Sequence, residues 1–237
     1  MRDPIYHRRF DYRRSMLPNA HLASLEDGVT TIEQARTKTG ASIGYPGWLV
    51  IYSMVLASLH PLRRHTLVET GTNRGASTII LAQALADSGA KGVVHTFEID
   101  PEVQAIARNN IAAAGHADRV VFHLGDTREI FAPILASIEG GISAAFLDGS
   151  HEQAVFEAEF AALRPQLVRG ALVLVDNTYP IMQPEKGEDA RVNGSLLTLQ
   201  QTHGGSLINM RFVSWYTPGL AVWQGELPLE ASDWEDS

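Results

Sequence analysis

The chain has 237 residues, of which 45% are hydrophobic and 19% are charged, as in an ordinary globular domain. Its formal net charge of -8 argues against a surface built mainly to bind nucleic acid, and the lack of cysteine excludes disulfides and thiolate metal ligands. The longest apolar run, residues 48–59, is shorter than the roughly 20 residues that span a bilayer and starts too late for a signal peptide. We therefore expect a cytoplasmic protein with neither a membrane nor a nucleic-acid partner.

The first 60 residues are predicted to form an N-terminal helical extension, or cap, ahead of one domain over residues 61–237. Basic and aromatic residues are interleaved near the start of the chain, at Arg2, Tyr6, Arg8, Arg9, Phe10, Tyr12, Arg13 and Arg14. This pattern is typical of a solvated or subunit-contacting arm, and binding of nucleic acid or of an acidic substrate is the alternative. A homo-oligomer formed through the N-terminal region is the corresponding expectation.

Short apolar runs alternate with amphipathic stretches from about residue 66 to residue 176, which predicts βαβ units and a parallel sheet. The predicted strands are residues 66–70, 93–98, 119–124, 143–148 and 170–176. The predicted helices are residues 77–86, 101–114 and 152–163. The second helix is the best delimited, because Asp100 can cap it, Pro101 suits its first position and Gly115 can close it.

The sequence changes character after residue 176. Residues 178–194 combine prolines, glycines and mixed charges, and we expect them to form a lid. Beyond them, residues 207–215 and 220–223 are apolar and β-prone, and residues 216–219 between them are typical of a hairpin turn. The sheet is therefore predicted to be mostly parallel and to end antiparallel.

A glycine-rich turn, ETGTNRG at residues 69–75, follows the first predicted strand and opens a helix. Such a turn lets the backbone approach a ligand closely, although glycine at this place can also serve tight packing. Glu98 ends the second predicted strand, where a carboxylate can bind ribose hydroxyls, and Asp126 ends the third, where it can accept from an adenine amino group. Either acid can instead be a cap. All three features lie at the carboxyl ends of strands, the edge where ligands bind in α/β sheets.

The segments ETGTNRGAST, HTFEIDPE and FHLGDTRE resemble the cofactor-binding motifs of class I methyltransferases. The resemblance covers about residues 66–224 and departs from the motif at Asn73, where the usual residue is glycine. It implies an α/β, Rossmann-like sheet of seven mostly parallel strands, with a reversed final strand, helices on both faces and bound S-adenosylmethionine. The implied cofactor-binding residues are Glu69, Gly71, Thr72, Asn73, Gly75, Ser77, Glu98, Ile99, Gly125, Asp126 and Asp148.

Oxygen-bearing side chains end the fourth and fifth predicted strands: Asp148 in AFLDGSH, and Asp176 and Asn177 in LVLVDN. Neighbouring parallel strands would bring these ends to one spot, where two carboxylates and an amide oxygen suit a hard divalent cation such as Mg²⁺. Each residue taken alone can equally be a cap or a turn initiator.

A second resemblance supports the metal interpretation. The catechol and caffeoyl-CoA O-methyltransferases hold their metal with an Asp after strand four and an Asp-Asn pair after strand five, which match Asp148, Asp176 and Asn177. They place a lysine base three residues after the first Asp, where this sequence has His151. The segment FLDGSH more closely resembles the corresponding segment of a bacterial group that includes macrolide sugar O-methyltransferases and relatives called cephalosporin hydroxylases.

These resemblances imply metal-dependent methylation of a hydroxyl on a small molecule, such as a sugar, a polyketide or a catechol-like diol, in natural-product biosynthesis. A cation makes a bound hydroxyl more acidic, and His151, with an unperturbed pKa of about 6.5, can accept the proton near neutrality. His151 and Asp148 are therefore the candidate catalytic residues. Two alternatives stay open: a cofactor-binding scaffold without catalysis, and a nicotinamide-dependent oxidoreductase, which the spacing of the glycine turn disfavours.

Overall fold

A computed structural model of the chain describes residues 16–40, 43–178, 192–210 and 219–225. Its centre is one sheet of seven strands in the order β3-β2-β1-β4-β5-β7-β6. The strands are β1 (Arg64–Thr70), β2 (Lys91–Glu98), β3 (Val120–Leu124), β4 (Ile142–Leu147), β5 (Leu167–Asp176), β6 (Ser206–Met210) and β7 (Leu220–Gln224). β1 to β5 pair in parallel, and β7 is antiparallel to both of its neighbours. The predicted sheet with a reversed final strand is thus confirmed.

The two faces of the sheet bury alternate residues of each central strand. In β1, Leu67 belongs to one hydrophobic cluster and Val68 to the other, and in β4 the same holds for Phe146 and Leu147. Successive side chains of a strand point to opposite faces, so a strand covered on both sides is mostly apolar. This explains why β4 appears in the sequence as a nearly continuous apolar run, interrupted by Ser143, rather than an alternating one.

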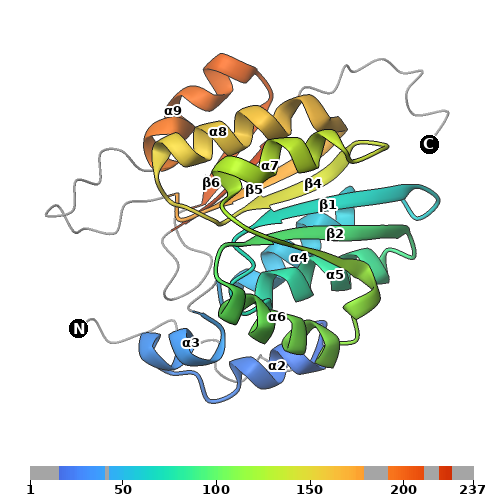
Figure 1. Cartoon of the computed structure of the whole chain (residues 1–237), viewed down its shortest axis with the longest axis vertical. Coiled ribbons are helices and arrows are strands. Elements are labelled where there is room, and N and C mark those ends of the chain that lie inside the picture. The colour runs from blue at the N-terminus through green and yellow to red at the C-terminus, as the bar shows by residue number, and fades with distance from the viewer. Residues whose placement is uncertain (1–15, 41–42, 179–191, 211–218, 226–237) are drawn as a thin grey trace, which may run out of the picture.

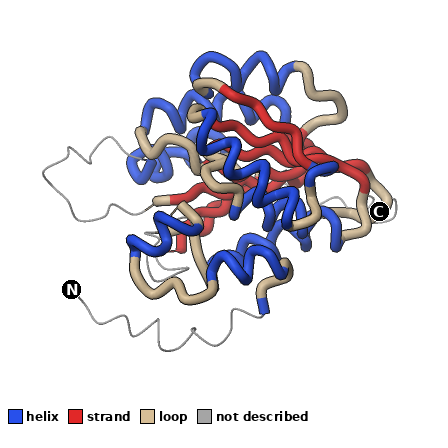
Figure 2. Tube along the Cα trace, turned by 60° about the horizontal axis from the view of Figure 1, so that its bottom comes forward, coloured by secondary structure: helices blue, strands red, loops and turns tan. Residues whose placement is uncertain are grey.

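Helices cover both faces of the sheet (Figures 1 and 2). One layer consists of α4 (Gly47–Ser58), α5 (Ala76–Asp87) and α6 (Pro101–Ala113). The other consists of α7 (Thr127–Ala136), α8 (Gln153–Leu163) and α9 (Val192–His203). Short 3₁₀ turns, η2 (Ala117–Arg119) and η3 (Arg164–Gln166), precede β3 and β5. In the described part of the chain, no helix has the length and apolar character to cross a membrane.

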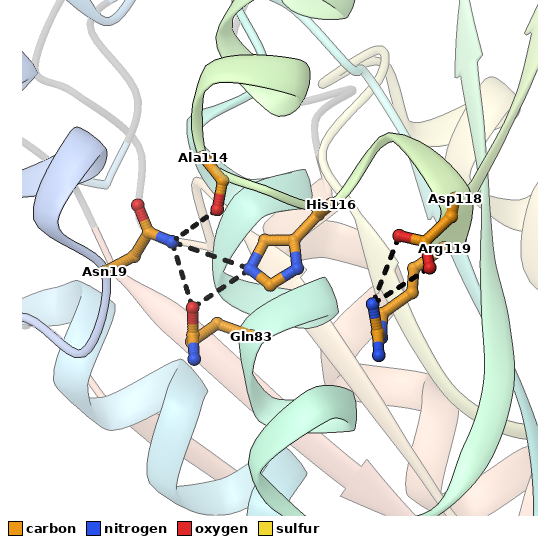
Figure 3. A network of polar contacts seen from close by, with 6 residues as sticks. All are labelled: Asn19, Gln83, Ala114, His116, Asp118 and Arg119. Carbon is orange, nitrogen blue, oxygen red and sulfur yellow. Dashed lines mark hydrogen bonds and ion pairs between the residues drawn. The ribbon is translucent and has the colours of Figure 1, made fainter.

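The N-terminal extension contains α2 (Ala20–Glu26) and α3 (Ile32–Lys38), which lie against the α6 side of the molecule (Figure 1). Asn19 connects α2 to that side of the molecule. Its side-chain oxygen caps α2. Its amide nitrogen donates to Gln83 Oε1 at 2.9 Å and to the Ala114 carbonyl at 3.1 Å (Figure 3). His116 Nε2 lies 2.9 Å from the same Gln83 oxygen. Polar contacts thus join α2 to α5 and to the end of α6.

Residues on the two sides of residue 60 share one hydrophobic core. Trp48 in α4 is fully buried, and it packs in the same hydrophobic cluster as Leu67 of the sheet. Residues 1–15, where the Arg-rich arm was expected, are outside the described ranges, and assembly through this region stays a prediction.

Two helices were not expected from the sequence. Pro133 interrupts the helical pattern of α7, and α9 begins at residue 192, inside the stretch 178–194 that was expected to be a lid. Most of that stretch, residues 179–191, lies outside the described part of the chain, as does most of the expected hairpin turn at residues 216–219.

Two histidines pair across β2 and β3, and we expect them to make the fold acid-sensitive. His95 Nδ1 lies 2.9 Å from His123 Nε2, and the rings stack at 5.2 Å. Burial, followed by the nearby His123, lowers the pKa of His95 to about 4. The unfolded chain therefore binds this proton more readily than the folded one, so the contribution of His95 to stability is fully present above about pH 6.5 and decreases as the pH falls towards 4.

Urea unfolding at pH 7.5 and at pH 5 measures this effect. We expect the midpoint of His95→Gln, relative to that of the wild type at the same pH, to be higher at pH 5 than at pH 7.5, because glutamine fills similar space without titrating. An equal difference between the two proteins at both pH values would assign any acid sensitivity to other groups.

Candidate active site

A cavity of about 540 Å³ opens at the carboxyl ends of the parallel strands, a volume in the usual range for small-molecule sites. It brings the expected cofactor region and the expected catalytic region into one space. The predicted site residues that line it are Gly71, Asn73, Glu98, Ile99, Gly125, Asp126, Asp148, His151, Asp176 and Asn177. Strand ends far apart in the sequence therefore contribute to a single site.

Four predicted cofactor residues, Glu69, Thr72, Gly75 and Ser77, do not line this cavity. Glu69 is fully buried and accepts hydrogen bonds from Thr78 and Thr96, and burial raises its pKa to about 7. All four residues are buried, so they belong to the core beside the turn and not to the surface of the cavity. Direct contact between them and a cofactor stays a prediction.

Gly75 has a packing role. Its backbone is in the left-handed region, with φ of 85°, at the residue that precedes α5. A Cβ there would lie 3.2 Å from the Ile111 side chain and 3.3 Å from Ala107, both in α6. The second glycine of the turn therefore allows α5 and α6 to pack closely, which is the packing role given above as an alternative to ligand binding.

Position 71 requires glycine because the backbone of Asp148 approaches it closely. The φ of Gly71 is 82°, and a Cβ would lie 2.1 Å from the carbonyl oxygen of Asp148. For Gly71→Ala, the left-handed conformation costs about 1–2 kcal/mol and overpacking typically about 1–3 kcal/mol, so we expect a loss of about 2–5 kcal/mol in the free energy of unfolding. Chemical denaturation measures it.

Gly115→Ala is the matched control for this substitution. Gly115 has nearly the same φ, 83°, but nothing lies within 4 Å of its would-be Cβ. Only the backbone cost of about 1–2 kcal/mol is expected there. If the two variants lose the same stability, the clash with Asp148 contributes nothing.

Asn73, the departure from the usual glycine, adopts the left-handed conformation with φ of 46°, which asparagine tolerates better than most residues. Its N–H donates to Glu98 Oε2 at 2.8 Å, and its Nδ2 donates to the Gly40 carbonyl at 3.1 Å. Glu98 Oε1 accepts from the backbone of Ile99 and Asp100, so this carboxylate is held firmly at the cavity. Gly40 also lines the cavity, a contribution from the N-terminal extension that the sequence did not predict.

Asp126 acts as a helix cap, which is the alternative to a ligand-binding role. It caps α7 by accepting from the Arg128 N–H at 2.9 Å, and its carboxylate also pairs with the Arg128 guanidinium. Hydrogen bonding to Arg128 lowers the pKa of Asp126. The carboxylate lines the cavity, but Arg128 already uses much of its capacity to accept hydrogen bonds.

Asp148, Asp176, Asn177 and His151 form one polar cluster at the ends of β4 and β5. Burial, followed by the nearby Asp176 carboxylate, raises the pKa of Asp148 well above its usual value. Burial also raises the pKa of Asp176 to about 7. Asn177 Nδ2 lies 3.1 Å from Asp176 Oδ2 and 2.9 Å from His151 Nε2, so the amide bridges the acid and the imidazole.

The donor set of this cluster fits a divalent cation in part. Asp176 Oδ1 is buried without a hydrogen-bond partner among the described residues, and a second carboxyl group, that of Asp148, lies beside it. Two close carboxylates suit a hard cation. Asn177, however, presents its nitrogen to Asp176 and His151, so it could act as a ligand only with its amide turned over. The described ranges contain no group of three or more His, Cys, Asp or Glu suited to a metal.

The sequence interpretation missed Glu159, a buried acid of α8. It accepts from Thr70 Oγ1 at 3.0 Å and from Thr127 Oγ1 at 2.7 Å. A signal was present, because Glu159 occupies the apolar stripe of its helix. The other members of that stripe are Val155, Phe156, Phe160 and Leu163. A lone carboxylate in such a stripe needs buried partners.

The seven-stranded sheet with its reversed last strand, together with a strand-end cavity holding the glycine turn and Glu98, defines a class I, Rossmann-like methyltransferase fold. Residues 68–178, somewhat less than half of the chain, match a family model described as a methyltransferase domain. The matched segment runs from β1 to the end of β5 and contains nearly all the residues that line the cavity.

Two relatives and one solved structure extend this comparison. Catechol O-methyltransferase of Mycobacterium tuberculosis is 34% identical over 116 residues, which are 49% of each chain. A tRNA (adenine(58)-N(1))-methyltransferase of Thermus thermophilus is 33% identical over 99 residues, 42% of this chain and 36% of that protein. The chain thus spans half or less of the length of these relatives.

The solved structure is the O-methyltransferase TomG of Streptomyces achromogenes in complex with SAM. It aligns with a TM-score of 0.69 at 20% identity, over 96% of this chain and 100% of TomG. At this identity the likeness establishes the fold and extends it beyond the segment that matches the family model.

Proposed function

We propose that this chain is an S-adenosylmethionine-dependent O-methyltransferase that acts on a hydroxyl of a small molecule. One observation carries the proposal: a single cavity joins the glycine turn and Glu98 to the cluster of Asp148, Asp176 and His151. The likeness to a catechol O-methyltransferase and to TomG supports the same activity. The tRNA methyltransferase shares a similar segment, but a chain with a net charge of -8 is poorly suited to a tRNA acceptor.

In this proposal the two ends of the cavity have different tasks. Gly71 offers a backbone surface that a ligand can approach closely, and Glu98 offers a carboxylate for ribose hydroxyls. The other end, with His151 and the two aspartates, receives the acceptor. Binding both molecules in one cavity aligns the methyl group with the acceptor oxygen, and such positioning can contribute about 7–11 kcal/mol to catalysis.

The reaction forms a bond between the acceptor oxygen and the methyl carbon and breaks the bond from that carbon to sulfur. The sulfonium becomes a neutral thioether, and the hydroxyl proton must leave. His151 takes this proton on Nδ1, and the Asn177 amide, when turned over, would hold the ring by accepting from Nε2–H. Asp148 and Asp176 would hold a divalent cation, which supplies Lewis-acid stabilisation of the acceptor oxygen when bound.

Calorimetry with S-adenosylhomocysteine and with NAD tests the cofactor assignment. We expect binding of the former and none of the latter; the reverse result would favour the oxidoreductase alternative. Assays with catechols and vicinal sugar diols, with Mg²⁺ and after chelation, then test the reaction. Binding of S-adenosylhomocysteine without turnover of any such acceptor would favour the scaffold alternative. Full turnover after exhaustive chelation would exclude the metal.

A further inference from the structure

We propose that Glu159 is a positioning residue that fixes three loops of the cavity relative to one another and thereby sets the affinity for the cofactor. This inference rests on the proposed function. The two Glu159 oxygens reach different loops: Thr70, which donates at 3.0 Å, immediately precedes Gly71, and Thr127, which donates at 2.7 Å, immediately follows Asp126. Gly71, Asp126 and Thr127 all line the cavity, so one buried carboxylate links the glycine turn to the loop after β3.

The third loop, after β4, packs on the same pair of residues. A Cβ on Gly149 would lie 3.1 Å from Thr70 Oγ1 and 3.4 Å from Glu159 Oε1, so this backbone rests directly against them. In addition, the Asp148 N–H donates to the Thr70 carbonyl at 3.1 Å. A displacement of Glu159 would therefore change the positions of the glycine turn, the Asp126 loop and the Asp148 loop together.

Burial of a carboxyl group at the position of Glu159 is energetically unfavourable. Only 4% of the residue is exposed, and Phe156 and Phe160 lie on the same buried stripe of α8. Burial raises the pKa of the carboxyl group, and the hydrogen bonds from the two threonines partly offset this increase. An apolar residue would suit the stripe better for packing alone. The position of the acid is explained by the loops that it joins.

The test is the affinity for S-adenosylhomocysteine, measured by calorimetry on the full chain. For Glu159→Met, which fills the space but accepts from neither threonine, we expect the Kd to rise about tenfold or more. Glu159→Gln should restore binding to within about threefold of the wild type, because its amide can accept from one hydroxyl and donate to the other. Thr127→Val removes one of the two bonds and should raise the Kd by an intermediate factor.

Two controls separate positioning from general stability. Glu157→Met alters an exposed acid of the same helix that bonds to Gln153 and Ser195 and does not line the cavity, so the Kd should not change. Phe160→Leu weakens the same buried stripe, so it should lower the melting temperature without changing the Kd. In a double-mutant cycle, Glu159→Met and Thr127→Val should be non-additive in Kd.

The outcomes are distinct. An unchanged Kd in Glu159→Met, or an equal rise in Phe160→Leu, would overturn the inference. If Glu159→Met does not fold, an unchanged Kd in Thr127→Val has the same consequence. If the wild type binds no S-adenosylhomocysteine, the proposed function itself fails, whereas wild-type binding with insensitive variants removes only the role of Glu159.

Discussion

Asp148→Asn is expected to lower kcat by about 10²–10³ or more, the usual effect of removing one electrostatic contact to a transition state, while the Kd for S-adenosylhomocysteine changes by less than about threefold. The substitution keeps the size of the side chain and removes one of the two carboxylates that would hold the cation. Steady-state assays and calorimetry at saturating Mg²⁺ measure both quantities.

Stability without metal provides an independent readout for the same variant. The pKa values of Asp148 and Asp176 are raised in the folded protein, so ionising the pair costs folding free energy, and the metal-free wild type should lose stability as the pH rises from about 4 through 7. Asp148→Asn removes one member of the pair. It should therefore melt at a temperature equal to or above that of the wild type at pH 8, and Mg²⁺ should stabilise only the wild type.

Asp118→Asn is the control for Asp148→Asn, because Asp118 is exposed, pairs with Arg119 and does not line the cavity. It should leave kcat, the Kd and the response to Mg²⁺ unchanged. Wild-type turnover by Asp148→Asn would contradict a catalytic role for this acid. If Mg²⁺ still stabilises Asp148→Asn, the cation binds at another site.

His151→Ala is expected to lower kcat by about 10²–10⁴, the usual contribution of a general base. Its ring lines the cavity, and Asn177 Nδ2 lies 2.9 Å from Nε2. Without this ring the acceptor proton must pass to water or hydroxide, so the rate should rise with pH without reaching the wild-type plateau. The dependence of kcat on pH, measured with a saturating acceptor, tests this expectation.

Added imidazole should partly restore the activity of His151→Ala, because a small base can diffuse into the space left by the side chain. His203→Ala is the control, since the ring of His203 packs against Phe160 in the helical layer, away from the cavity. An unchanged pH profile in His151→Ala would remove His151 as the base and leave Asp148 as the remaining candidate.

Much of this site could be predicted because strand ends have local signatures. The apolar run that ends at Leu147 and the one that ends at Val175 each stop at an acid, Asp148 and Asp176. Parallel strands carry their carboxyl ends to one edge, so the topology alone brings these acids near the glycine turn. No long-range contact had to be known for that inference.

One feature is local but stays open in the sequence: Asp126 pairs with Arg128, two residues away, although a ligand-binding role would fit the sequence equally well. Other features depend on contacts between residues far apart in the sequence. Gly40, which lines the cavity, accepts a hydrogen bond from Asn73 across 33 residues. Glu159 was overlooked for the same reason: its partner Thr70 is 89 residues away. Residue type indicates which bonds these groups can make, but not which partner the folded chain brings within reach.

Hydrophobic periodicity and the residues at strand ends by themselves determined the α/β class and brought the candidate acids to one edge of the sheet, because these properties follow from short-range backbone geometry. The seven-stranded sheet and the roles of the acids were implied by family resemblance. Only the tertiary structure decided which acids line one cavity and which are buried in the core beside it. Those assignments depend on distances of about 3 Å between side chains of different strands and helices, and packing of the whole chain sets such distances.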